Sequence, residues 1–157
     1  MKLSDFFVSE SVIPELEATD RNGVIRELVA SLAAHRAVDP SQTDTIVRIA
    51  IKRENEGSTG FGKGVAVPHV KVDGVSKMAA TIGRSSTGVD FAALDRAPVY
   101  TVVLLVSPKD DPDGHLAAME QIFRHLQRDN FRRFLRQADT AEAIIDLIKE
   151  ADELTGS

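Results

Sequence analysis

The spacing of apolar residues predicts two helices in the first third of the chain. Either Thr19 or Asp20 can cap the first helix, and Asp39-Pro40 ends it. Its apolar face, at helical intervals, consists of Val24, Ile25, Leu28, Val29 and Leu32. A second helix is predicted from Ser41 to about Glu54, because Ser41-Gln42-Thr43-Asp44 resembles a capping box with aspartate in place of glutamate.

The middle of the chain has the pattern of strands. Residues 12–18 alternate weakly and contain a proline, which predicts a short edge strand. Four glycines among residues 57–64 are incompatible with the interior of a helix or strand, and residues 65–70 then read as extended chain. Residues 78–83 and 99–106 are rich in strand-forming residues. The second of these runs is apolar on both faces, which predicts a central strand.

The last third of the chain is helical again. One helical face there consists of Leu116, Met119, Ile122, Phe123 and Leu126. Asp139-Thr140-Ala141-Glu142 forms a capping box ahead of a final apolar stripe. We therefore expect an α/β protein, with residues 1–157 as a single domain and a mixed parallel and antiparallel sheet flanked by helices on both faces. The pattern leaves the strand order open.

Composition excludes several classes of protein. The 157 residues are 43% hydrophobic and 27% charged, which is a globular balance, and the absence of cysteine excludes disulfides and thiolate sites. The longest apolar run, residues 102–106, is too short to span a bilayer, and the N-terminal residues lack a signal-peptide core. We expect a cytoplasmic protein without direct membrane insertion.

The charge pattern argues against nucleic-acid binding. The formal net charge is −5, tryptophan is absent, and there is one tyrosine. The basic cluster at residues 124–136 is interleaved with apolar residues, so we interpret it as the solvated side of a helical segment. We expect no nucleic acid among the partners.

Two of the four histidines are candidates for chemistry. His69 follows Pro68 at the end of a short extended run beside the glycine-rich loop, so the backbone that leads to it is constrained. A histidine hydrogen-bonded at a sheet edge fits this position equally well. His115 opens a helix, where backbone N–H groups favour an anion, although a simple helix-start residue also fits. His35 and His125 are expected to be exposed helical residues.

Arg53 lies at the end of the second predicted helix, just ahead of the glycine-rich loop. Its planar guanidinium suits phosphate, but an arginine there is usually only a partner of the helix dipole. The glycine-rich loop is not a nucleotide-binding loop, because Lys63 lacks a following serine or threonine and a strand follows instead of a helix. The histidine spacing does not single out a metal site. We therefore predict neither a cofactor nor a metal.

The segment from Arg53 to His69 resembles the signature of enzyme IIA domains of the bacterial phosphotransferase system, fructose/mannitol class. The resemblance is closest to the free-standing nitrogen-regulatory IIA proteins, and it extends over essentially the whole chain. The residues that carry it are Arg53-Glu54, Gly57-Ser58-Thr59-Gly60-Phe61-Gly62-Lys63-Gly64-Val65-Ala66-Val67-Pro68-His69, Lys2-Leu3-Ser4-Asp5-Phe6, Gly88-Val89-Asp90-Phe91, Leu94-Asp95, His115-Leu116 and Asp139-Thr140-Ala141-Glu142.

The resemblance implies that a histidine-phosphorylated carrier protein, HPr or a paralogue, phosphorylates His69. It also implies that His115 and Arg53 line the site, and that Ser58 and Thr59 position the loop. Phe61 departs from the smaller aliphatic residue of many relatives. The implied function is a phosphocarrier with a regulatory output. The alternatives are a sugar-specific IIA that passes phosphate to a separate IIB or permease component, a regulatory interaction module without phosphorylation, and a histidine-metal hydrolase.

Overall fold

The computed structural model describes residues 1–154. Its strands are β1 Gly60–Gly62, β2 Val65–Ala66, β3 His69–Val72, β4 Ala79–Val89 and β5 Val99–Pro108. Its α-helices are α1 Arg21–Ala34, α2 Thr43–Glu56, α3 Pro112–Leu126, α4 Asp129–Gln137 and α5 Ala141–Leu154. Short 3₁₀ turns lie at Leu3–Asp5 (η1), Ser9–Ser11 (η2) and Pro40–Gln42 (η3).

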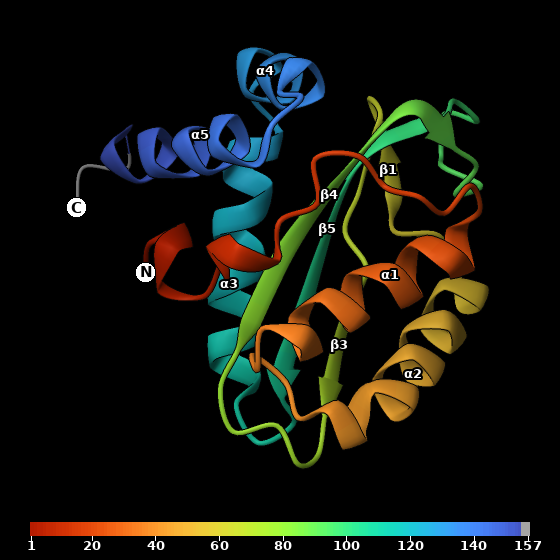
Figure 1. Ribbon diagram of the computed structural model, residues 1–157, viewed down its shortest axis with the longest axis vertical. Coiled ribbons are helices and arrows are strands. Elements are labelled where there is room, and N and C mark those ends of the chain that lie inside the picture. Colours follow the sequence, from red (N-terminus) through yellow and green to blue (C-terminus); the bar gives the residue numbers. More distant parts are fainter. Residues whose placement is uncertain (155–157) are drawn as a thin grey trace.

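Strand β5 is the centre of a mixed five-stranded sheet (Figure 1). β2 and β3 follow one another along one edge of β5, both parallel to it and in one constant register. Residues Val67 and Pro68 separate the two strands, and β4 pairs with β5 in the antiparallel direction. The break before His69 therefore lies inside the sheet and not at its end.

The sheet is covered on both faces, as expected. Val102, Leu104 and Val106 pack into the cluster that contains the buried faces of α1 and α2. Val103 and Leu105 belong to a second cluster with residues of α3, α4 and α5. Because side chains alternate between the faces of a strand, an all-apolar strand can contribute to both clusters. The predictions of an α/β class, a mixed sheet and a central strand at residues 99–106 are confirmed.

The helix starts were predicted with mixed success. Asp20 caps α1 and accepts a hydrogen bond from the Gly23 amide at 2.6 Å. The capping box predicted at Ser41 is wrong, because the carboxylate of Asp39 caps a 3₁₀ turn instead by accepting from the Ser41 amide at 2.9 Å. In the last helix Thr140 accepts from the amide of Ala143 at 3.1 Å.

The strand predicted at residues 12–18 is also wrong. This segment lies beside β4 but makes only an isolated parallel bridge, between Ile13 and Gly83. Pro14 has no amide proton to continue a ladder, so single hydrogen bonds, such as Leu16 N to Arg84 O at 2.8 Å, hold the segment. Within residues 1–154, no helix has the length and apolar character needed to cross a membrane.

Candidate functional site

The backbone around Pro68 fixes the ring of His69. His69 is the first residue of β3, and its Nδ1 lies 2.7 Å from the carbonyl oxygen of Val67. A carbonyl only accepts hydrogen bonds, so Nδ1 carries the proton and Nε2 of a neutral ring keeps its lone pair. The ring is only partly buried, which leaves this lone pair available to a reacting group.

His115 lies beside His69, although 45 residues separate them in sequence. Asp111 caps α3 by accepting from the Gly114 amide at 3.0 Å, which fixes the first turn of the helix and so the place of His115. The centroids of the two imidazole rings are 5.6 Å apart, with an angle of 44° between the planes. Nδ1 of His115 is 2.7 Å from the hydroxyl of the buried Ser107 on β5.

Both histidines are held in the neutral form. Burial lowers the pKa of His69, and the positive charges of Arg53 and Lys71 act in the same direction. The Val67 carbonyl and the Glu54 carboxylate partly oppose this shift in the pKa of His69. Burial lowers the pKa of His115 to about 4, with smaller contributions from His69 and Lys71. At neutral pH the pair therefore offers two uncharged imidazoles.

Arg53 supplies a cation at the start of the glycine-rich loop. It lies in the last turn of α2, and its Nη1 donates to the carbonyl of Gly57 at 2.6 Å. Its positive charge contributes to the lowered pKa of His69. The structure thus brings His69 and His115 together and places Arg53 at the end of α2, in contact with the first residue of the glycine-rich loop.

Glu54 is a residue of the site that the sequence analysis missed. Its side chain is 2% exposed, and its two carboxylate oxygens accept from the amide and the hydroxyl of Thr59. Ser58 holds the same loop, because its hydroxyl donates to the Phe91 carbonyl at 2.6 Å and accepts from the Gly60 amide at 2.9 Å. The signal available in the sequence was a glutamate directly beside Arg53 and ahead of the glycine-rich loop.

His35 and His125 lie away from this pair in sequence and differ in burial. His35 is exposed, as expected, and its Nδ1 contacts the carbonyl of Ser31 at 2.9 Å. The expectation of an exposed His125 is wrong, because its side chain is 2% exposed. The chain turns after α3, and Phe131 of α4 packs against the His125 ring with a centroid distance of 5.7 Å. Neither ring nitrogen of His125 has a hydrogen-bond partner within residues 1–154.

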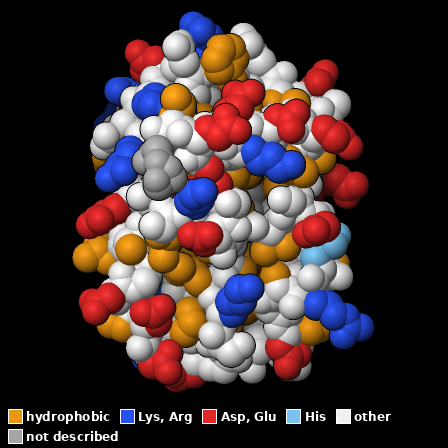
Figure 2. Space-filling model, turned by 90° about the vertical axis from the view of Figure 1, so that its left-hand side faces the viewer, with side chains coloured by type: hydrophobic (Ala, Val, Ile, Leu, Met, Phe, Trp, Pro, Cys, Tyr) orange, Lys and Arg blue, Asp and Glu red, His pale blue; other side chains and the backbone are white. Residues whose placement is uncertain are grey.

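The described residues form no metal-ligand cluster at this site. Charged side chains of both signs lie together on the face of the protein shown in Figure 2. Within residues 1–154, no group of three or more histidine, cysteine, aspartate or glutamate residues is placed to hold a metal ion. On the face shown in Figure 2, lysine and arginine side chains lie among aspartate and glutamate side chains.

Comparison with known proteins assigns the family. Residues 5–151 match the model of the family described as phosphoenolpyruvate-dependent sugar phosphotransferase system, EIIA 2. The chain belongs to this family. The predicted resemblance is confirmed.

Relatives of this EIIA protein include both regulatory and sugar-specific proteins. It is 36% identical over 124 residues to the nitrogen regulatory protein of Pseudomonas aeruginosa, covering 79% of this chain and 80% of that one. It is 31% identical over 120 residues to the fructose-specific EIIA component of Haloferax volcanii, covering 74% and 78%. The fructose-specific EIIABC component of Bacillus subtilis is 30% identical over 98% of this chain, which spans only 24% of that longer protein.

Solved structures show the same fold. Nitrogen regulatory protein IIA-Ntr from Neisseria meningitidis superposes with a TM-score of 0.83 at 22% identity, covering 93% of this chain and 98% of that one. The Escherichia coli IIA mannitol enzyme, solved in complex with phosphorylated IIB, superposes with a TM-score of 0.76 at 19% identity, covering 92% and 99%. The EIIA protein therefore shares its architecture with both branches of the family.

Proposed function

We propose that this protein is a cytoplasmic phosphocarrier that accepts a phosphoryl group on Nε2 of His69 from an HPr-like phosphohistidine protein, and that it acts as a regulatory, nitrogen-type IIA. The observation that carries the proposal is the hydrogen bond from Nδ1 of His69 to the Val67 carbonyl. This bond directs the free lone pair of a neutral imidazole to Nε2, beside His115.

In the proposed step, the Nε2 lone pair of His69 attacks phosphorus and forms a new P–N bond. The P–N bond of the donor phosphohistidine breaks, and its electron pair leaves with the donor imidazole. The proton on Nδ1 stays in place, where the Val67 carbonyl stabilises the positive charge that develops on the ring. No proton transfer is needed between the two proteins, and the products resemble the reactants, so the step is expected to be reversible.

Arg53 and His115 are proposed to hold the transferring group. Phosphoryl transfer requires alignment and neutralisation of the equatorial oxygens more than covalent help. The guanidinium of Arg53 supplies a fixed positive charge. His115 donates to a phosphoryl oxygen when its proton is on Nε2, and the Ser107 hydroxyl then donates to Nδ1 of His115.

A second candidate is a sugar-specific IIA that passes the phosphoryl group to a separate IIB or permease component. The similarity to the fructose-specific component of Haloferax volcanii favours it. The greater similarity to the nitrogen regulatory protein of Pseudomonas aeruginosa favours the regulatory function. The chemistry at His69 is the same in both, and only the acceptor differs.

The test is incubation with phosphoenolpyruvate, enzyme I and HPr, followed by intact-mass and phosphosite analysis. We expect one phosphoryl group on His69, none in His69→Ala, and unchanged labelling in the control His35→Ala. The adduct should be lost in acid, unlike a phosphoserine at Ser58. Labelling of His69→Ala at the wild-type level would refute the proposal. Transfer onward to a purified IIB component would instead identify the sugar-specific branch.

A further inference from the structure

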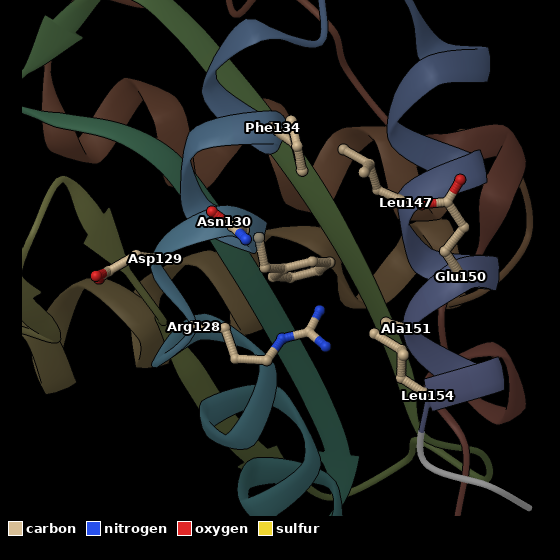
Figure 3. Close-up of a pocket in the computed structure, with 9 residues that line it drawn as sticks. Arg128, Asp129, Asn130, Phe134, Leu147, Glu150, Ala151 and Leu154 are labelled. Carbon is tan, nitrogen blue, oxygen red and sulfur yellow. The ribbon is translucent and has the colours of Figure 1, made fainter.

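Helices α4 and α5 follow the end of α3 (Figure 1), and a groove lies between them (Figure 3). Its volume is about 500 Å³. It is lined by Arg128, Asp129, Asn130, Phe131, Phe134, Leu147, Glu150, Ala151 and Leu154. A second hollow of about 380 Å³ shares Phe134, Leu147 and Glu150 with it and continues to Gln137 and Ala143. We refer to these two adjoining hollows together as the groove along α5.

The groove exposes large apolar side chains. Phe134 is 45% exposed and Leu154 is 68% exposed. From Ala143 to Leu154 the groove follows α5 for about 16 Å, at 1.5 Å per residue, which is roughly three helical turns. A contiguous apolar patch with a polar rim is typical of an interaction site.

Arg128 provides an unpaired positive charge within this apolar surface. Its guanidinium lies over the ring of Phe131, 5.2 Å from the centroid, and points into the groove in Figure 3. Its side chain is partly buried and makes no ion pair or hydrogen bond within residues 1–154. The neighbouring carboxylate of Asp129, which also lines the groove, contacts Arg132. A charge in such a setting is complemented by a carboxylate.

The wall of the groove that α5 forms is negatively charged. Asp146 and Glu150 of α5 are exposed along the groove and form no ion pair within residues 1–154. An occupant that matches both walls presents a carboxylate to Arg128 and basic side chains to α5. The apolar floor between the walls matches an apolar stripe with helical spacing.

We propose that the groove between α4 and α5 binds an amphipathic helical segment of a partner protein, about three turns long, with a carboxylate that pairs with Arg128 and basic residues that face α5. The occupant is a protein helix because the groove runs along α5 between two helices and combines apolar side chains with charged walls. Because Arg128 and the carboxylates of α5 lie on opposite walls, the acidic edge of the bound helix faces Arg128 and its basic edge faces α5.

This groove is separate from the histidine pair. His115 is in the first turn of α3, and Leu126 at the other end of α3 is about 16 Å away along the helix axis, at 1.5 Å per residue. The groove begins beyond that end, at Arg128. A partner can therefore bind there while His69 remains open to a phosphoryl donor.

The experiment uses the full chain, labelled with ¹⁵N, and two synthetic amphipathic peptides of 15 residues. Both carry a leucine stripe with lysines along one edge, and they differ only in a glutamate or a lysine on the other edge. We expect the glutamate peptide to shift amide resonances of α4 and α5, and to bind about tenfold more tightly than the lysine peptide. Arg128→Gln should abolish that difference, whereas Lys149→Gln on the exposed side of α5 should preserve it. Phe134→Ser should weaken both peptides.

The proposal is wrong if millimolar glutamate peptide leaves α4 and α5 unperturbed, if the two peptides bind wild-type protein equally, or if the shifted amides surround His69. Circular dichroism of each variant checks that it is folded. Phosphorylation of His69 is measured on the same samples. Failure of peptide binding with normal phosphorylation would refute only this inference, and the reverse result would refute only the proposed function.

Discussion

The imidazole rings of His69 and His115 lie 5.6 Å apart, and each has its Nδ1 fixed by an oxygen atom of the protein. The Val67 carbonyl fixes the ring of His69, and the Ser107 hydroxyl fixes that of His115. Because these contacts engage Nδ1, Nε2 is the nitrogen of each ring that stays available for chemistry.

Removing either supporting group should slow phosphoryl transfer. We expect Arg53→Ala and His115→Gln each to reduce the single-turnover rate from phosphorylated HPr by more than tenfold, because losing one preorganised contact costs about 2–4 kcal/mol of transition-state stabilisation. The two losses should not add, since both groups act on the same oxygens. Arg48→Ala, an exposed arginine of α2, is the control. Wild-type rates in both single variants would show that neither Arg53 nor His115 contributes to the transfer step.

Phosphoryl acceptance should persist in weakly acidic solution. Burial lowers the pKa of His69 below its usual 6.5, so the ring stays neutral as the pH falls through 6.5. The initial rate of labelling should therefore remain near its neutral-pH value at pH 6.5 and decline only below it. The donor is prepared in advance as phosphorylated HPr, so that enzyme I does not limit the rate. A midpoint at or above pH 6.5 would contradict the expected direction of the shift.

Glu54 should act on the site both by charge and by hydrogen bonding. Its negative charge raises the pKa of His69, and its oxygens accept from Thr59. Both Glu54→Gln and Glu54→Ala should lower the pKa of His69, measured by NMR titration of its ring protons. Only Glu54→Ala should also lose roughly 1–3 kcal/mol of stability, because it leaves buried donors of Thr59 unpaired. Equal stability of the two variants would exclude the hydrogen-bonding role.

The stability of the fold should decrease in acid through His115. The pKa of His115 is about 4 in the folded protein and near 6.5 when unfolded, so the unfolded chain binds more protons between these values. The stabilising contribution of neutral His115 is complete above pH 6.5 and is lost as the pH falls toward 4. The loss is on the order of 3 kcal/mol, because one pKa unit corresponds to about 1.36 kcal/mol. Urea unfolding at pH 7 and pH 5 should show a smaller pH dependence in His115→Gln than in wild type. An unchanged dependence would contradict this assignment.

The buried ring of His125 should reduce stability without serving the site. Neither of its nitrogens has a hydrogen-bond partner among the described residues 1–154, and burial lowers its pKa. Replacing it with leucine removes the unpaired polar atoms, so His125→Leu should increase the free energy of unfolding, most at pH 5.5, by about 1–3 kcal/mol. Labelling of His69 should not change. The exposed control His35→Leu should stay within about 0.5 kcal/mol of wild type. A destabilised His125→Leu would indicate a packing role for the ring.

Local patterns in the sequence were sufficient to predict most of the helices and the central strand. The apolar face of α1, the apolar run in β5 and the cap at Asp20 are properties of neighbouring residues, so periodicity and capping rules identify them. The glycine-rich loop and Pro68 similarly indicated that His69 is held in a special backbone setting. These features depend on few contacts beyond their own segment.

Only the tertiary structure decided which distant side chains meet. His115 lies beside His69 because β3 and α3 are both joined to β5, and no local pattern encodes that pairing. Glu54 became a buried anchor because the loop folds back on the end of α2. The burial of His125 depends on the turn that brings Phe131 over it. In each case long-range packing sets the environment of a polar side chain, and that environment, not the residue type, determines its protonation and its partners.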